Sequence, residues 1–379
     1  MSEVRRFELA IPHAQLDDLN RRLDAARWPE KETVDDWSQG VPLAALRELV
    51  AYWRNGYDWR RCEARLNGLG SSVTRLDGLD FHYLHVRSRH EDAMPVVLTH
   101  GWPGSIVEFL DTIGPLTNPE AHGGSAADAF HVVIPSLPGY GFSGKPTATG
   151  WNIERIARAW AELMARLGYE RWFAQGGDWG SIVTVALGAQ APKGLAGIHL
   201  NLPVARPTRT DFESPGRDEQ RAIAASEHYK KWESGYSTLQ STRPQTIGYS
   251  LVDSPVGLAA WIYEKMWSWT DNAGRPEDAL SRDTILDNIM LYWLPAAGAS
   301  AARLYWESFG TIGRVGKVHV PAAVSIFPRE ISRAPRSWSE RILKNIVSWN
   351  EAEKGGHFAA WEQPELFVRE LRAAFRLMR

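Results

Sequence analysis

Short apolar runs alternate with helical stretches from about residue 73 onward, and this alternation limits the possible folds more than any other feature of the chain. Helical periodicity is clearest over residues 153–167 and 181–191. Strands that alternate with helices in this way form a mostly parallel sheet with helices on both faces. The expected strands cover residues 81–86, 96–99, 132–135, 172–175 and 195–200.

The alternation stops at Pro203 and resumes only at residue 318. The intervening segment is polar, helical in its pattern and rich in Trp and Tyr. Strand character returns at residues 318–327 and 344–348, and an amphipathic helix is expected over residues 364–375. An insertion at Pro203 would cover the carboxyl ends of the strands, where open α/β sheets bind ligands.

Three parts of the chain are therefore predicted. Residues 73–203 and 312–379 form an α/β core, and residues 204–311 form a helical cap inserted into it. Residues 1–72 have helical periodicity and are expected to pack on the core as an N-terminal helical extension.

Charge and cysteine content exclude several classes of protein. The chain has 43 Lys and Arg against 45 Asp and Glu, so neither nucleic acid nor an anionic membrane is an expected partner. Cys62 is the single cysteine, which rules out an internal disulfide and favours a cytoplasmic protein. No signal peptide and no apolar stretch of about 18 residues is found, so no membrane anchor is expected. A homodimer is compatible with the sequence, which leaves the oligomeric state open.

The strongest motif lies between an expected strand and an expected helix, with the sequence Gly-Gly-Asp-Trp-Gly at residues 176–180. It matches G-x-nucleophile-x-G, the nucleophile elbow of α/β-hydrolases, with Asp178 in the usual place of serine. Glycines are expected there because the turn is strained and passes close to its neighbours. The alternative is that Asp178 only caps the following helix. The predicted fold class is therefore an α/β-hydrolase fold with a mostly parallel, eight-stranded sheet.

A second loop, with the sequence His-Gly-Trp-Pro-Gly-Ser at residues 100–105, follows the strand expected at residues 96–99. In α/β-hydrolases this loop supplies one backbone N–H to an oxyanion hole, and the residue after the nucleophile supplies another. The expected donors are Trp102 and Trp179. We expect His100 to brace the loop rather than to take part in the reaction.

The order nucleophile, acid, histidine along the chain requires a late histidine. His357 meets this requirement in a glycine-rich loop ahead of the last helix. The acid should follow an earlier strand, and Glu330 comes directly after the strand expected at residues 318–327, whereas no carboxylate follows residues 195–200. We assign Glu330 as the acid; the alternative is an ion pair at the surface.

Two further patterns do not indicate a cofactor or a metal. Residues 139–144 match G-x-G-x-x-G, but residues 145–152 separate them from the next expected helix. No helix N-terminus is then placed to hold a pyrophosphate. The eleven histidines show no H-E-x-x-H or comparable spacing. No cofactor and no metal are predicted.

A carboxylate nucleophile narrows the chemistry. Attack on an ester or amide would give a labile anhydride, whereas displacement at a saturated carbon gives an alkyl ester that water can cleave. Opening an epoxide and expelling a halide both fit this description. The epoxide oxygen must be protonated as it leaves, so a weak acid such as a phenol is required, whereas a halide needs only N–H donors.

The sequence resembles the microsomal-type epoxide hydrolases over nearly the whole chain, including a helical N-terminal region. The resemblance implies a triad of Asp178, Glu330 and His357. It also implies that Tyr236 and Tyr305 of the cap protonate the epoxide. One departure is that microsomal relatives begin with a membrane anchor, which is not expected here. The matching motifs lie at residues 100–105, 135–143, 176–181, 197–201, 253–262 and 355–360.

Two assignments implied by the resemblance leave alternatives open. Tyr263 and Tyr292 stand close enough to Tyr305 in the sequence to be confused with it, and core packing is the other explanation of each tyrosine. Four cap tryptophans are candidates for an aromatic pocket, although helix packing explains them at least as easily. They are Trp261, Trp267, Trp269 and Trp293.

The implied function is hydrolysis of a small-molecule epoxide to a vicinal diol through a covalent ester on Asp178. Water activated by His357 and Glu330 would cleave that ester. The first alternative is a haloalkane or haloacid dehalogenase that uses the same nucleophile. The second is a hydrolase-fold binding protein without activity.

Overall fold

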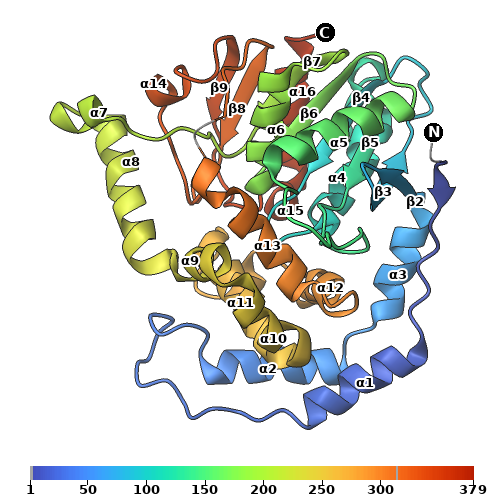
Figure 1. The fold of residues 1–379 in the computed structure, drawn as a ribbon, viewed down its shortest axis with the longest axis vertical. Coiled ribbons are helices and arrows are strands. Elements are labelled where there is room, and N and C mark those ends of the chain that lie inside the picture. Colours follow the sequence, from blue (N-terminus) through green and yellow to red (C-terminus); the bar gives the residue numbers. More distant parts are fainter. Residues whose placement is uncertain (1–2, 313–314) are drawn as a thin grey trace.

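The computed structural model describes residues 3–312 and 315–379, in which a nine-stranded sheet carries helices on both faces (Figure 1). The strands are β1 (Arg5–Arg6), β2 (Ser71–Leu76), β3 (Leu79–Val86), β4 (Met94–Thr99), β5 (Phe130–Pro135), β6 (Trp172–Gly176), β7 (Leu195–Leu200), β8 (Ala322–Ile326) and β9 (Ile346–Glu351). Their order in the sheet is β1-β2-β3-β5-β4-β6-β7-β8-β9. The pairs from β5 to β9 are parallel, whereas β1, β2 and β3 join the edge in antiparallel pairs.

The central strands are buried on both faces, and β5, β6 and β8 have no exposed residue. Helices α4 (Leu110–Thr117) and α16 (Pro364–Arg376) pack on one face, and α5 (Ile153–Arg166) and α6 (Trp179–Gln190) pack on the other. Burial on both faces explains why these strands read as continuous apolar runs rather than as alternating patterns. The predicted α/β fold class is confirmed.

The cap, residues 204–311, consists of helices among the described residues and lies at the edge of the sheet where the parallel strands end (Figure 1). Helix α11 begins at Pro255, and the preceding Ser254 caps it by accepting a hydrogen bond from the Gly257 N–H at 2.9 Å. The cap helices are α7 (Arg209–Glu213), α8 (Arg217–His228), α9 (Gly235–Thr242), α10 (Pro244–Asp253), α11 (Pro255–Trp269), α12 (Arg282–Trp293) and α13 (Gly298–Ser308).

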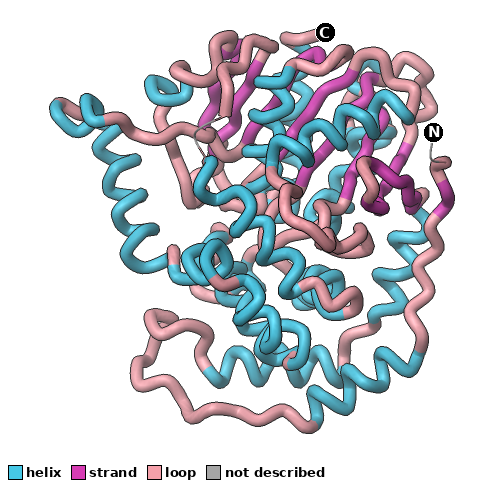
Figure 2. The backbone as a smooth tube through the Cα atoms, viewed as in Figure 1, coloured by secondary structure: helices cyan, strands magenta, loops and turns pink. Residues whose placement is uncertain are grey.

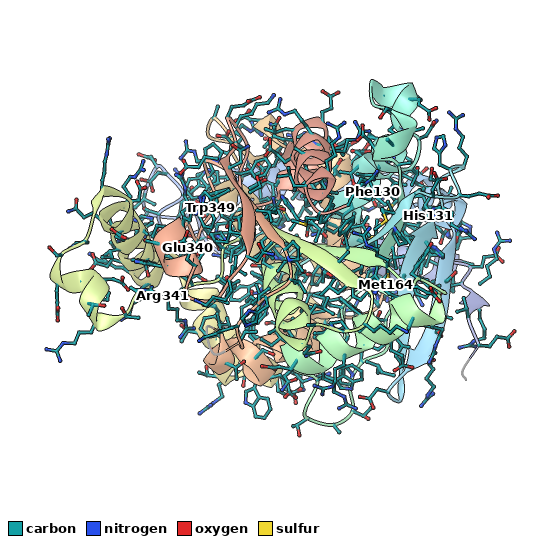
Figure 3. The ribbon with its side chains drawn as sticks, turned by 90° about the horizontal axis from the view of Figure 1, so that it is seen from above. Phe130, His131, Met164, Glu340, Arg341 and Trp349 are labelled. Carbon is teal, nitrogen blue, oxygen red and sulfur yellow. The ribbon has the colours of Figure 1, made fainter. Side chains whose placement is uncertain are left out.

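Helices α7 and α8 project from the body and are attached to the core near its short helix α14 (Arg336–Ser339). The guanidinium of Arg341 donates to both carboxylate oxygens of Asp211, at 3.0 and 2.8 Å. Arg341 and its neighbour Glu340 lie beside these helices in the view from above (Figure 3). This contact fixes the first part of the cap to the core.

The N-terminal extension contains α1 (His13–Asp24), α2 (Leu43–Asn55) and α3 (Trp59–Gly68), with a loop over residues 25–42 between the first two (Figure 2). It is not helical throughout, because β1 pairs with β2 at the sheet edge. The seven strands predicted by residue range correspond to β3–β9. The expected total of eight is exceeded by one, because β2 and β1, neither of which was assigned a range, complete the sheet.

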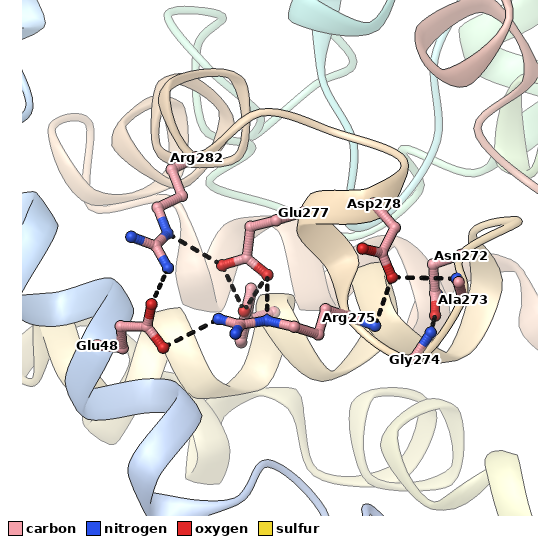
Figure 4. A network of polar contacts seen from close by, with 9 residues as sticks. Glu48, Asn272, Ala273, Gly274, Arg275, Glu277, Asp278 and Arg282 are labelled. Carbon is pink, nitrogen blue, oxygen red and sulfur yellow. Dashed lines mark hydrogen bonds and ion pairs between the residues drawn. The ribbon is translucent and has the colours of Figure 1, made fainter.

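Charged side chains join this extension to the cap (Figure 4). Glu48 on α2 accepts hydrogen bonds from Arg275, at 2.9 Å, and from Arg282. Asp287 on α12 accepts from the Tyr57 hydroxyl at 2.7 Å and from Arg61 at 2.8 Å. The extension therefore holds the cap from the side opposite the sheet (Figure 1).

Two boundaries in the core differ from the sequence-based expectation. The strand expected at residues 318–327 shortens to β8, because Pro321 has no N–H for the ladder and Val318 forms only an isolated bridge. The strand expected at residues 344–348 begins later, as β9. The division into extension, core and cap stays a prediction.

We expect Asp287→Ala to lower the free energy of unfolding by about 2–3 kcal/mol, because it leaves the Tyr57 hydroxyl and the half-buried Arg61 without their acceptor. Chemical denaturation followed by circular dichroism measures this change. Glu340→Ala is the control, since its ion pair with Arg336 is exposed and should contribute less than about 0.5 kcal/mol. Equal effects of the two substitutions would contradict the role assigned to Asp287.

Candidate active site

Asp178 lies in a strained turn between β6 and α6, with φ 49° and ψ −128°. Such a conformation costs about 1–3 kcal/mol in a residue other than glycine. The flanking glycines make the turn possible. A Cβ on Gly176 would lie 2.1 Å from the carbonyl carbon of Gly180, and one on Gly180 would lie 1.9 Å from the carbonyl oxygen of Thr99. The expected elbow geometry is present.

The Asp178 side chain does not cap α6, which removes the alternative explanation of this residue. Instead, its Oδ1 accepts a hydrogen bond from the backbone N–H of Trp102 at 2.8 Å. Trp102 lies in the loop after β4, and Trp179 is the first residue of α6. The N–H of Trp102 thus points at the Asp178 carboxylate. Trp179, the other expected donor, directly follows Asp178 in the chain.

His357 and Glu330 meet Asp178 at the same edge of the sheet, because each follows the end of a parallel strand. His357 Nδ1 lies 2.7 Å from Oε1 of Glu330, and Nε2 lies 3.4 Å from Oδ2 of Asp178. The Glu330 side chain is 1% exposed, which is not compatible with a surface ion pair. The three residues therefore form a continuous Asp–His–Glu chain.

The two carboxylates control the charge of the imidazole. Burial alone would lower the pKa of His357, but the negative charges of Glu330 and Asp178 and their hydrogen bonds outweigh it and raise that pKa well above its ordinary value. If the charge on Asp178 disappeared, only Glu330 would still raise the pKa of His357. The pKa of His357 would then fall, which makes its neutral form more available as a base.

His100 braces the loop as expected. Its Nδ1 lies 2.9 Å from the carbonyl oxygen of Gly101, and its Nε2 accepts the N–H of Leu137 at 3.2 Å. Burial lowers the pKa of His100 to about 4, so the ring is neutral. It joins the loop after β4 to the loop after β5, which contains the glycine-rich residues 139–144.

Aromatic rings from core and cap gather at this site. The indole of Trp102 stacks on the Tyr236 ring, with centroids 4.6 Å apart and an interplanar angle of 9°. Tyr305 meets Trp102 and Trp179 edge-on, at 5.9 and 4.8 Å, and its ring lies 5.8 Å from that of Tyr236. The two tyrosines named from the sequence thus come together beside both expected N–H donors.

Both phenols are protonated at neutral pH. Burial is the main reason that the pKa of Tyr236 and that of Tyr305 rise well above the ordinary value, and the charge on Asp178 adds to the effect in both. Among the described residues, the Tyr305 hydroxyl has no hydrogen-bond partner. Tyr263 and Tyr292 bind elsewhere, to the Glu277 carboxylate at 2.9 Å and to the Gly104 carbonyl at 2.7 Å. This geometry favours Tyr305 over Tyr263 and Tyr292 as the second expected proton donor beside Tyr236.

The four cap tryptophans divide into two groups. Trp269 lies 5.0 Å from the His357 ring, and Trp261 lies 6.5 Å from Trp102, so both contact the site. Trp267 and Trp293 do not: Trp267 stacks on Trp37 at 4.9 Å, and Trp293 lies under Arg22 at 5.8 Å. These two pack against the N-terminal extension because they stand on other sides of their helices.

Sequence reasoning missed three residues around the site. The Tyr229 hydroxyl lies 2.9 Å from that of Tyr236, and its spacing of seven residues, two helical turns, was the available signal. Lys265 is buried in apolar helix α11, four residues from both Trp261 and Trp269. The third is Glu362, for which the sequence offered no spacing or motif that could have identified it.

Glu362 and the end of α11 hold the loop that carries His357. Glu362 accepts the N–H of Phe358 at 3.0 Å and the N–H of Asp271 at 2.7 Å. The His357 N–H donates to the Trp269 carbonyl at 2.9 Å. Burial raises the pKa of Glu362 to about 7. The cap thereby contributes directly to the position of His357.

Comparisons with known proteins identify the family and the fold of the chain. Residues 4–109 match the family described as "Epoxide hydrolase N terminus", and residues 94–229 match the α/β hydrolase fold. "Epoxide hydrolase 1" of Sus scrofa is 35% identical over 99% of this chain and 89% of its own length. The chain belongs to the epoxide hydrolase family. It is therefore a hydrolase of the class that acts on ether bonds.

Other epoxide hydrolases extend the similarity. A protein of Stigmatella aurantiaca named "Putative epoxide hydrolase" is 59% identical over 99% of this chain and 86% of its own length. The structure of Aspergillus niger epoxide hydrolase superposes with a TM-score of 0.89 at 34% identity, covering 100% of this chain and 97% of that one. Among residues 3–312 and 315–379, no helix is both long and apolar enough to cross a bilayer.

Asp178→Asn should lower the pKa of His357, because the amide removes the negative charge next to Nε2. NMR titration of the histidine side chains measures this pKa in both proteins. The signal is assigned by its absence in His357→Gln. His82, whose pKa is lowered by burial alone, serves as the internal control. A titration of His357 that Asp178→Asn leaves unchanged would contradict the electrostatic coupling.

Proposed function

We propose that the protein hydrolyses a small-molecule epoxide to a vicinal diol through a covalent alkyl ester on Asp178. The observation that carries this proposal is that the buried rings of Tyr236 and Tyr305 both pack on Trp102, whose N–H binds the Asp178 carboxylate. A carboxylate displaces at saturated carbon, and a phenol protonates the departing alkoxide. Membership of the epoxide hydrolase family supports the same reaction.

In the first step, Asp178 attacks one ring carbon while Tyr236 and Tyr305 hold the epoxide oxygen. The C–O bond of the ring breaks as the bond to the aspartate oxygen forms, and one phenol transfers its proton. Oδ1 is bonded to the Trp102 N–H, so Oδ2 is the oxygen available for attack. Oδ1 then becomes the carbonyl oxygen of the ester.

In the second step, His357 takes a proton from water, and the resulting hydroxide attacks the ester carbon. The bond between that carbon and Oδ2 then breaks, so the diol leaves with Oδ2 and with the hydroxide proton, and the oxygen from water stays in the Asp178 carboxylate. Glu330 orients the imidazole through Nδ1 and stabilises its positive charge. The N–H groups of Trp102 and Trp179 stabilise the oxyanion that develops on Oδ1. Esterification has meanwhile removed the charge of Asp178, and the pKa of His357 has fallen accordingly.

His357→Gln should stop the reaction after the first step, because no base remains to activate water. Incubation with styrene oxide should then add the mass of one substrate molecule to the intact protein. Peptide mapping should locate that mass at Asp178. The control is the double variant Asp178→Asn/His357→Gln, which should gain no mass. A His357→Gln protein that forms diol at the rate of the parent and carries no adduct would contradict the proposal.

Product analysis distinguishes the proposed epoxide hydrolase from the dehalogenase alternative. The parent protein should convert styrene oxide to its diol and release no chloride from a chloroalkane. Chloride release without diol formation would favour the dehalogenase. Paired phenols beside the nucleophile argue against it, since a halide leaves without a proton.

A further inference from the structure

Lys265 is a buried ammonium in the middle of the aromatic cluster. Its side chain is 5% exposed, although a lysine is almost never fully buried without a partner. Its neighbour Glu264 provides one, with Oε2 at 2.7 Å from Nζ. Glu264 is itself 28% exposed, so water screens the carboxylate more than it screens the ammonium.

The ammonium faces two rings of the site. Nζ lies 4.7 Å from the centroid of the Tyr236 ring and 5.4 Å from that of Trp269. Both distances are within the range of cation–π contacts, which contribute about 0.5–2 kcal/mol depending on how far water is excluded. Tyr236 is 6% exposed and Trp269 is fully buried, so little water weakens the attraction.

A cation over a phenol ring interacts more strongly with the phenolate than with the neutral phenol, because the phenolate carries a full negative charge. The other neighbours of Tyr236 act in the opposite direction. Burial is the largest of the effects that raise its pKa, followed by the nearby Tyr305, Tyr229 and Asp178. A proton donor in such surroundings needs a compensating positive charge, and the described residues place Lys265 there.

We propose that Lys265 is a positioning residue that promotes proton transfer from Tyr236 to the epoxide oxygen by stabilising the phenolate formed in that step. This inference rests on the proposed function, in which Tyr236 is a proton donor. The proton moves from the Tyr236 hydroxyl to the oxygen as the ring C–O bond breaks and the Asp178 ester forms. The proton that His357 later takes from water returns to the phenolate through solvent, so the net reaction remains epoxide plus water to diol.

The inference is tested on the full chain in a His357→Gln background, where only the first step proceeds. Quenched-flow mass spectrometry gives the rate of adduct formation from styrene oxide. Lys265→Met, similar in length but uncharged, should slow it about tenfold, as expected for a loss near 1.4 kcal/mol. Lys265→Arg should restore most of the rate, because it keeps a cation at the ring.

The same substitution in a Tyr236→Phe background separates this role from general packing. If the ammonium acts through the hydroxyl of Tyr236, Lys265→Met should change the rate less than about twofold there. An equal slowing in both backgrounds, or no rescue by arginine, would overturn the inference. Lys265→Gln replaces Lys265→Met if circular dichroism shows that the latter does not fold.

Failure of the inference and failure of the proposed function give different results. An unchanged rate in Tyr236→Phe would remove Tyr236 as a donor and with it the basis of the proposal. Absence of any adduct in the His357→Gln protein would contradict the covalent mechanism itself. A slowed Tyr236→Phe protein combined with an unaffected Lys265→Met protein would overturn the role of Lys265 alone.

Discussion

The two oxygens of the Asp178 carboxylate have different partners. Oδ1 accepts the Trp102 N–H at 2.8 Å, and Oδ2 lies 3.4 Å from Nε2 of His357. The arrangement requires a backbone with positive φ at Asp178 and glycines on both sides of it, because a Cβ on either glycine would collide with the main chain. It also requires that β4, β6, β8 and β9 end at one edge of the sheet. The rest of the site is built around this carboxylate.

The cap is connected to that carboxylate through side chains of the core. Trp102 supplies its N–H to Asp178 and its indole to Tyr236, so one residue links Asp178 and the cap. Helix α11 adds one further link, with Trp269 at His357, and its Lys265 contacts the Tyr236 ring within the cap. The N-terminal extension in turn holds α12 through Asp287. Displacement of the cap would therefore disturb both the expected proton donors and the expected base.

The local parts of the site could be predicted from the sequence. Gly-Gly-Asp-Trp-Gly between a strand and a helix identifies the elbow, since the conformational requirement acts on adjacent residues. Parallel topology brings strand ends together, so Glu330 and His357 could be placed by their positions after strands. Their roles in the reaction stay predictions.

Contacts between cap helices could not be predicted in the same way. Trp267 and Trp269 are two positions apart on α11, yet one packs on the extension and the other on His357. Helical periodicity predicts that Trp267 and Trp269 lie on different sides of α11, but it does not predict which side faces the site. Tyr229 and Lys265 were missed for the same reason. The edge strand β1 was missed because two charged residues, Arg5 and Arg6, give no strand pattern.

The central claim is that Asp178 forms a bond to the substrate and that water attacks the resulting ester. A single turnover in ¹⁸O-labelled water, with enzyme in excess over styrene oxide, tests it most directly. The account predicts that ¹⁸O enters the Asp178 carboxylate and that the first diol formed is unlabelled. Appearance of ¹⁸O in that first diol, with an unlabelled Asp178 peptide, would mean that water attacks the epoxide directly and would contradict the account.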